Sequence, residues 1–118
     1  MNVAGSPSPI AELRVDDFSV QSADAEAPLV VHFWAPWCAP CAMLKPVFEQ
    51  AAAMRGDLRF ASCDIDEQPE LARELAIRNL PTLAIYHRGL ERARISGTMR
   101  LGSLLDWFDR HRVSAQAG

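Results

Sequence analysis

Residues 29–34 limit the fold of this sequence more than any other segment. They read LVVHFW, a short apolar run rich in β-branched and aromatic residues in which His32 is the one polar side chain. This composition is typical of a strand buried on both faces. Apolar residues then recur at helical spacing over residues 44–52, and we expect that helix to end at Gly56. A buried strand followed closely by a helix predicts an α/β domain built in layers.

The rest of the chain continues this alternation. Strand composition returns in residues 58–65, 82–87 and 90–96, and apolar residues follow helical spacing in residues 69–77 and 101–108. Arg88-Gly89 separates the last two strands by two residues, which is typical of a β-hairpin. A βαβ crossover followed by a hairpin and a helix predicts a mixed central β-sheet with helices on both faces.

The chain of 118 residues is long enough for one domain with a hydrophobic core. Neither a linker nor an internal repeat indicates a second domain. Residues 1–9 are small, polar and interrupted by two prolines, and residues 114–118 carry no large side chain. We therefore expect a folded domain over residues 10–113 between two flexible tails.

Charge and hydropathy exclude several classes of protein. The net charge is −3 at pH 7 and the basic residues are scattered, so no basic stripe is available to bind nucleic acid. No apolar stretch approaches the roughly 18 residues that span a membrane, and residues 1–10 lack the basic start and apolar run of a signal peptide. We expect a cytoplasmic protein that binds neither nucleic acid nor membranes. Three cysteines are too few for a disulfide scaffold.

Cys38 and Cys41 stand three residues apart where the predicted strand passes into the predicted helix. At a helix N-terminus, unpaired backbone N–H groups and the positive end of the helix dipole stabilise a thiolate over a thiol. Cys38 is therefore the expected nucleophile. Cys41, one turn into the helix on the same face, is the expected resolving thiol. Pro40 suits the first turn, where its missing N–H costs no hydrogen bond, and it limits the movement of the two sulfurs.

The pair could instead be half of a zinc site or two unrelated cysteines. Structural zinc sites usually need four ligands, and the other candidates, Cys63 and three histidines, form no second ligand pair. Redox chemistry is the favoured interpretation. Trp37, directly before the pair, either fills the core or offers a flat apolar surface to a partner chain, and we favour the surface.

Segment 33–41 (FWAPWCAPC) resembles the active-site segment of the thioredoxin family. Further matches are residues 64–66 (DID), residues 80–82 (LPT), Arg88-Gly89 and Gly97. The resemblance covers the whole predicted domain and implies the thioredoxin fold.

The resemblance also implies a function. It points to a thiol-disulfide oxidoreductase that reduces disulfide-containing proteins, uses no bound cofactor or metal, and receives electrons from an NADPH-dependent flavoprotein thioredoxin reductase. We therefore expect a monomeric protein disulfide reductase. Two alternatives stay open, a thiol oxidant or isomerase and a protein-binding module with incidental redox activity. Ala39-Pro40 between the cysteines favours the reductase, because it lacks the histidine of oxidants and isomerases that would stabilise the thiolate further.

The resemblance further implies a docking surface for substrates. The peptide bond before Pro81 is expected to be cis, with Pro81 facing the cysteines. Leu80 would then pair its backbone with an extended substrate chain. The expected docking residues are Trp37, Leu80, Pro81, Gly97 and Thr98.

Two residues of the predicted core depart from the family pattern. His32 stands where thioredoxins usually carry a buried aspartate that is thought to relay the proton of the resolving cysteine, and Ser62 stands where they carry a lysine. His32 either takes over this catalytic proton transfer or is a core histidine satisfied by a hydrogen bond, for instance from Ser62. Both interpretations stay open at this point.

The remaining cysteine and histidines receive simpler interpretations. Cys63 lies in the middle of a predicted strand, and we expect it to be a buried, small apolar residue rather than a regulatory thiol. His87 and His111 lie near the ends of predicted elements, and we expect both at the surface.

Overall fold

The computed structural model describes residues 10–23 and 26–117, with side chains up to residue 111. Its elements in chain order are β1 (Ile10–Glu12), α1 (Val15–Ala23), β2 (Leu29–Trp34), α2 (Ala39–Met54), β3 (Arg59–Asp64), α3 (Pro69–Glu74), β4 (Thr82–His87), β5 (Leu90–Ser96) and α4 (Leu101–Ala117). Every strand and helix expected from the sequence is present. None of the helices in the described residues is long and apolar enough to cross a membrane.

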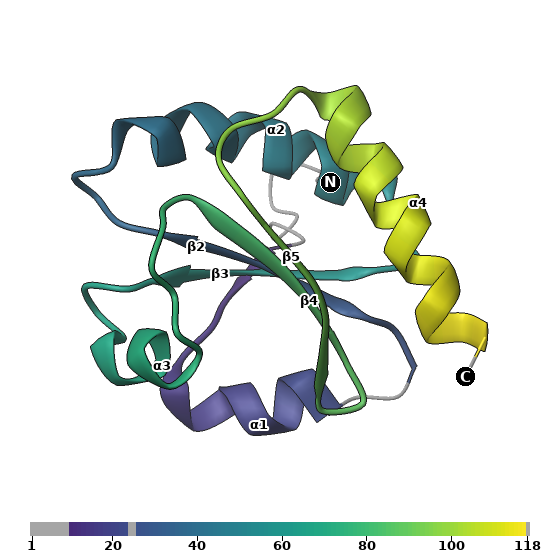
Figure 1. Cartoon of the computed structure of the whole chain (residues 1–118), viewed down its shortest axis with the longest axis horizontal. Helices are drawn as coiled ribbons and strands as arrows, with labels where there is room; N and C mark the ends of the chain where they lie inside the picture. The colour runs from purple at the N-terminus through teal and green to yellow at the C-terminus, as the bar shows by residue number, and fades with distance from the viewer. Residues whose placement is uncertain (1–9, 24–25, 118) are drawn as a thin grey trace, which may run out of the picture.

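The five strands form one mixed sheet in the order β1-β3-β2-β4-β5. β1 and β2 both run parallel to β3, and β4 is antiparallel to both β2 and β5. Helices α1 and α3 cover one face of this sheet, and α2 and α4 cover the other (Figure 1). The predicted fold class, a mixed central sheet with helices on both faces, is confirmed.

The side chains of β2 point alternately to the two faces, as in any strand. Its odd-numbered residues belong to the core on the side of α1 and α3. Val30 belongs to the core on the side of α2 and α4, and the ring centroid of His32 lies 5.4 Å from that of Phe48 in α2. The central strand therefore directs its one polar side chain towards α2, the helix that begins at the cysteine pair.

The two N-terminal elements, β1 and α1, were not expected from the sequence. β1 is three residues long, and Ser22 is the one fully buried residue of α1. Neither element carries the apolar periodicity that reveals longer strands and helices. β1 is placed by its pairing with β3, where Ile10 lies opposite Phe60. Such a tertiary contact has no local signal in the sequence.

Two helices differ in length from the expectation. α3 ends at Glu74 rather than at residue 77, because the chain turns there and Ala76 adopts a φ of 55°. α4 continues to Ala117 and so includes residues 114–117, which were expected to belong to a flexible tail. These residues include two alanines, the strongest helix former, and no glycine or proline interrupts them. The expected tail over residues 1–9 lies outside the described residues.

Candidate active site

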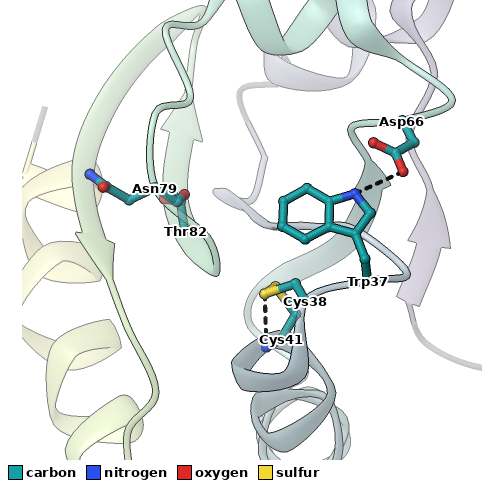
Figure 2. Close-up of a disulfide and its surroundings, with 6 residues drawn as sticks. All are labelled: Trp37, Cys38, Cys41, Asp66, Asn79 and Thr82. Atoms are coloured by element: carbon teal, nitrogen blue, oxygen red, sulfur yellow. Dashed lines mark hydrogen bonds between the residues drawn. A yellow bond between two sulfur atoms is a disulfide. The ribbon is translucent and has the colours of Figure 1, made fainter.

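The cysteine pair lies at the start of α2. Cys38 and Cys41 form a disulfide, with their Cα atoms 5.3 Å apart (Figure 2). Cys38 is the N-cap residue of α2 and has extended backbone angles, with φ −94° and ψ 103°. Pro40 lies in the first turn, where no backbone N–H is needed. The expected position of the pair, between the central strand and the long helix, is confirmed.

The two sulfurs have different electrostatic surroundings. The backbone N–H of Cys41 donates a hydrogen bond to the Cys38 sulfur, with N and Sγ 3.2 Å apart. This donor and the positive end of the α2 dipole favour a negative charge on Cys38 once the disulfide is reduced. Cys38 is also the more accessible of the two, 7% exposed against 2% for Cys41. The electrostatic stabilisation therefore acts on the sulfur that a substrate can reach.

An apolar groove of about 380 Å³ lies beside Cys38. The start of α2, the loop after β3 and the segment before β4 contribute its lining residues, which are Trp37, Cys38, Ala39, Pro40, Ile65, Ile77, Arg78 and Leu80. Trp37 is 69% exposed, and its indole Nε1 donates to Asp66 Oδ2 at 3.0 Å (Figure 2). Because the Trp37 ring is so exposed, it does not fill the core. Trp37 therefore lies at the surface, and its contact with a partner chain stays a prediction.

The other expected docking residues lie around Pro81. The Leu80–Pro81 peptide bond is cis, as the resemblance implies. The buried Pro81 accepts a hydrogen bond at its carbonyl oxygen from the N–H of Gly97, at 2.9 Å. Gly97 has a φ of 99°, a conformation in which a side chain would be strained. Thr98 is exposed, and neither it nor Gly97 lines the groove beside Cys38.

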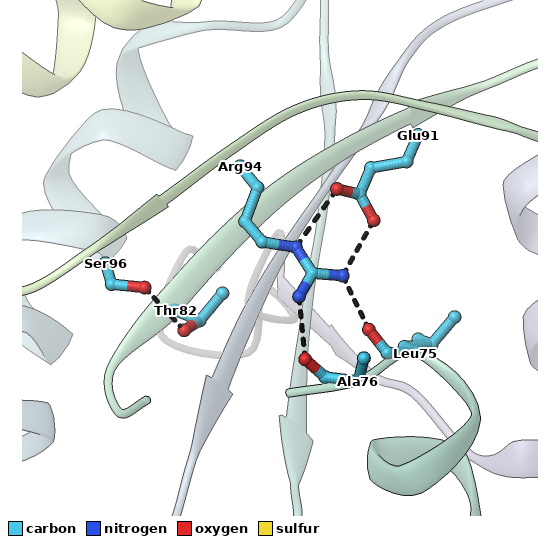
Figure 3. A network of polar contacts seen from close by, with 6 residues as sticks. All are labelled: Leu75, Ala76, Thr82, Glu91, Arg94 and Ser96. Atoms are coloured by element: carbon cyan, nitrogen blue, oxygen red, sulfur yellow. Dashed lines mark hydrogen bonds and ion pairs between the residues drawn. The ribbon is translucent and has the colours of Figure 1, made fainter. Parts of the chain in front are cut away.

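Arg94 of β5 holds the turn that follows α3 (Figure 3). Its guanidinium donates to the carbonyl oxygens of Leu75 and Ala76 at 2.6 and 2.9 Å, and it forms an ion pair with Glu91 at 2.8 Å. These two carbonyls lie at the C-terminal end of a helix, where the dipole favours a cation. The role of Arg94 could not be predicted from the sequence, since nothing local in a strand sequence indicates which distant carbonyl oxygens an arginine will reach.

A second cavity, of about 360 Å³, reaches both cysteines, and His32, Ser62 and Lys45 also line it. His32 is 3% exposed, and within the described part of the chain its Nε2 has no hydrogen-bond partner. The pKa of His32 is lowered to about 4, mainly by burial and to a smaller extent by the positive charge of Lys45. The imidazole is therefore neutral at physiological pH.

Ser62 lies opposite His32 in the pairing of β2 with β3. Although both residues line the same cavity, the hydrogen bonds of the described residues include none between their side chains. Ser62 therefore does not satisfy His32. The free Nε2 is compatible with a role in proton transfer.

The low pKa of His32 predicts that acid destabilises the protein through this residue. The pKa is 6.5 in an ordinary environment and about 4 in the folded state, so the unfolded chain binds the proton first as the pH falls. The contribution of His32 to stability is complete above about pH 6.5 and is lost as the pH falls towards 4, by up to about 3 kcal/mol. Urea unfolding of the parent protein and His32→Leu at pH 7 and pH 4 measures this effect. The variant should lose less stability on acidification, and equal losses would contradict a buried neutral imidazole.

Cys63 and the other two histidines lie apart from the cysteine pair. Cys63 is fully buried, and burial, followed by the charge of Asp64, raises the pKa of its thiol to about 11. It packs as an apolar residue, as expected. His111 is partly exposed. The expectation for His87 is wrong, because β4 lies inside the sheet between β2 and β5, and His87, on the same face of the strand as Ile85, is only 3% exposed. Within residues 10–23 and 26–117, no three His, Cys, Asp or Glu residues are grouped to hold a metal ion.

Known proteins resemble this chain over most of its length. The family model for thioredoxin matches residues 9–110. Thioredoxin C-3 of Corynebacterium nephridii is 35% identical over 105 residues, which are 89% of this chain and 72% of the relative. The thioredoxin of Mycobacterium tuberculosis is 38% identical over 98 residues, 80% of this chain and 84% of the relative. The solved structure of Malassezia sympodialis thioredoxin has a TM-score of 0.78 at 29% identity, covering 87% of this chain and 90% of that one. These matches agree with the fold and the cysteine pair, and the chain belongs to the thioredoxin family.

Proposed function

We propose that this chain reduces disulfide bonds in other proteins with Cys38 as the nucleophile and Cys41 as the resolving thiol. Family membership and the cysteine pair make the chain a thiol-disulfide oxidoreductase of the protein disulfide reductase type. The observation that carries the two roles is the hydrogen bond from the Cys41 N–H to the Cys38 sulfur. It supplies a donor to one sulfur of the pair, at the end of the helix where the dipole also favours a thiolate.

The proposed reaction consists of two thiol-disulfide exchanges. The Cys38 thiolate attacks one sulfur of the substrate disulfide, forms a mixed disulfide and releases the first substrate thiolate, which takes up a proton. Cys41 then loses its proton, and its thiolate attacks the Cys38 sulfur. This second exchange releases the other substrate thiol and closes the Cys38–Cys41 disulfide. Two electrons and two protons pass to the substrate, so another reductant must restore the dithiol.

The substrate chain is proposed to lie in the groove beside Cys38. Trp37 and Leu80 line this groove, and the backbone of Leu80 would pair with an extended peptide. Pro81, Gly97 and Thr98 would continue the docking surface. The hydrogen bond from the Gly97 N–H to the Pro81 carbonyl supports this arrangement, because it joins the two segments that carry these residues.

His32 is the proposed proton acceptor for Cys41. Both residues line the cavity of about 360 Å³, which is large enough for water to connect them. The neutral ring and the free Nε2 support this role.

The recharging partner is proposed to be an NADPH-dependent flavoprotein thioredoxin reductase, and the protein is proposed to act as a monomer in the cytoplasm. Its bacterial relatives, named thioredoxins, support this assignment. A reducing compartment also suits a chain that keeps its third cysteine as a buried thiol.

Equilibration with glutathione redox buffers distinguishes the reductase from its alternatives. After acid quenching and alkylation, the fraction of the Cys38–Cys41 disulfide gives the reduction potential. We expect a value at or below that of the glutathione pool, about −220 to −260 mV. A value near about −120 mV would indicate a thiol oxidant. Failure to accelerate the reduction of insulin by dithiothreitol would favour a binding module.

A further inference from the structure

The groove beside Cys38 carries one permanent charge. Apart from the cysteine, Arg78 is the one ionisable side chain among the residues that line it. Arg78 is exposed, and no ion pair or hydrogen bond engages its side chain anywhere in the described ranges 10–23 and 26–117. Asp66, which follows the groove residue Ile65 in the sequence, accepts the hydrogen bond of the Trp37 indole (Figure 2). A free guanidinium therefore stands at the edge of an otherwise apolar groove.

The segment that carries Arg78 is anchored on both sides. Before it, Arg94 binds the two carbonyl oxygens that follow α3 (Figure 3). After it, the Thr82 hydroxyl donates to the carbonyl oxygen of Asn79. A substrate therefore meets Arg78 on backbone that is already ordered, and less conformational entropy is lost when a contact forms.

Arg78 lies two residues before Leu80, where the substrate backbone is proposed to pair. A peptide that passes Cys38 and Leu80 brings its nearby side chains within reach of a residue lining the same groove. A guanidinium can bind a carboxylate through two parallel hydrogen bonds, a geometry that a neutral amide does not match. We infer that Arg78 selects disulfide substrates that carry an aspartate or glutamate a few residues from the reactive cysteine. This inference rests on the proposed reductase function and adds the substrate class.

The expected preference is modest. An exposed ion pair stabilises a bound substrate only slightly. This stabilisation corresponds to about a twofold to fivefold difference in kcat/KM between an acidic and a neutral peptide. The net charge of −3 opposes an acidic peptide at long range. Charges further apart than about 8 Å are largely screened at physiological salt, so the contact with Arg78 outweighs this repulsion.

The test uses peptides in which a single cysteine carries a neutral 2-pyridyl disulfide. Glutamate, glutamine or lysine is placed in turn at each of the neighbouring positions on either side of that cysteine. The Cys38 thiolate of the reduced protein displaces 2-thiopyridone, whose absorbance gives the rate of the first exchange, and the peptide is joined to Cys38 in the groove until Cys41 displaces it. We expect at least one position at which the glutamate peptide reacts about twofold to fivefold faster than the glutamine peptide, with the lysine peptide slowest.

Charge reversal in Arg78→Glu should invert this order. Arg110→Glu is the matched control, since it makes the same change of charge on an exposed residue of α4 that does not line the groove. It should keep the parental order, and raising the salt to about 1 M should reduce the differences. A parental order retained in Arg78→Glu, or no charge preference at any position, would overturn the inference.

Bis(2-hydroxyethyl) disulfide separates this inference from the proposed function. It is small and has no charged side chain for Arg78 to bind, so the rate at which each protein reduces it is the reference to which that protein's peptide rates are normalised. If the parent protein failed to reduce it, the reductase assignment itself would be wrong. If all three proteins reduced it but reacted with the glutamate, glutamine and lysine peptides at equal rates, only the role of Arg78 would be wrong.

Discussion

Replacing Cys41 with serine is expected to abolish turnover and to leave substrate attached to Cys38. The first exchange needs only the Cys38 thiolate, whose stabilising donor is a backbone N–H that the substitution retains. The second exchange needs a thiol at position 41, and a serine hydroxyl cannot replace it. Insulin reduction should fall at least about 10³-fold. Mass spectrometry of the non-reduced protein should show a mixed disulfide between Cys38 and an insulin chain.

Cys63→Ala is the matched control for this experiment. Cys63 is fully buried, and the pKa of its thiol is raised to about 11, so the thiol is protonated at neutral pH. The control should turn over at the parental rate, and alkylation of the reduced parent protein should label Cys38 before Cys41 and Cys63. Faster trapping in Cys38→Ser than in Cys41→Ser would mean that the two roles are reversed, and equal trapping would mean that the cysteines do not have distinct roles.

His32→Leu is expected to slow the release of reduced substrate by about 10²-fold. This effect lies at the lower end of the rate enhancements that general bases provide. An imidazole with a pKa of about 4 is fully unprotonated at neutral pH, but it is a weak base. His32→Asp should retain release, since a carboxylate can also accept the Cys41 proton. His32→Asn is nearly isosteric with the aspartate variant but cannot accept a proton, so it should be as slow as the leucine variant.

Stopped-flow measurement of the second exchange across the neutral pH range tests this role. The free energy of unfolding at pH 7 is measured alongside, so that only folded variants are compared. Glu12 and Glu49 line the same cavity and are competing acceptors. Glu49→Gln and Glu12→Gln should leave release unchanged if His32 accepts the proton. Parental rates in folded His32→Leu would rule out proton transfer through His32.

The longer elements and the cysteine pair could be predicted from the sequence. Residues 29–34 are apolar enough to indicate a central strand, and the strands at 82–87 and 90–96 agree with β4 and β5. The position of Cys38 at the start of a helix follows from the same local pattern. These features share a physical basis, because a strand or helix that packs against the core repeats its apolar residues at its own period. β1 and α1 lacked such a pattern, and they were missed.

The tertiary structure decided how these elements complete the site. The sequence placed His32 in a buried strand, but only packing against α2 gave it a cavity shared with Cys41, the nearby charge of Lys45 and an unpartnered Nε2. The groove with Arg78 and the anchor supplied by Arg94 also join residues far apart in the chain. Such contacts depend on strand register and on the packing of helices onto the sheet, which arise only when the whole chain folds. Local periodicity therefore determined the reactive cysteines, whereas packing determined the groups that surround them.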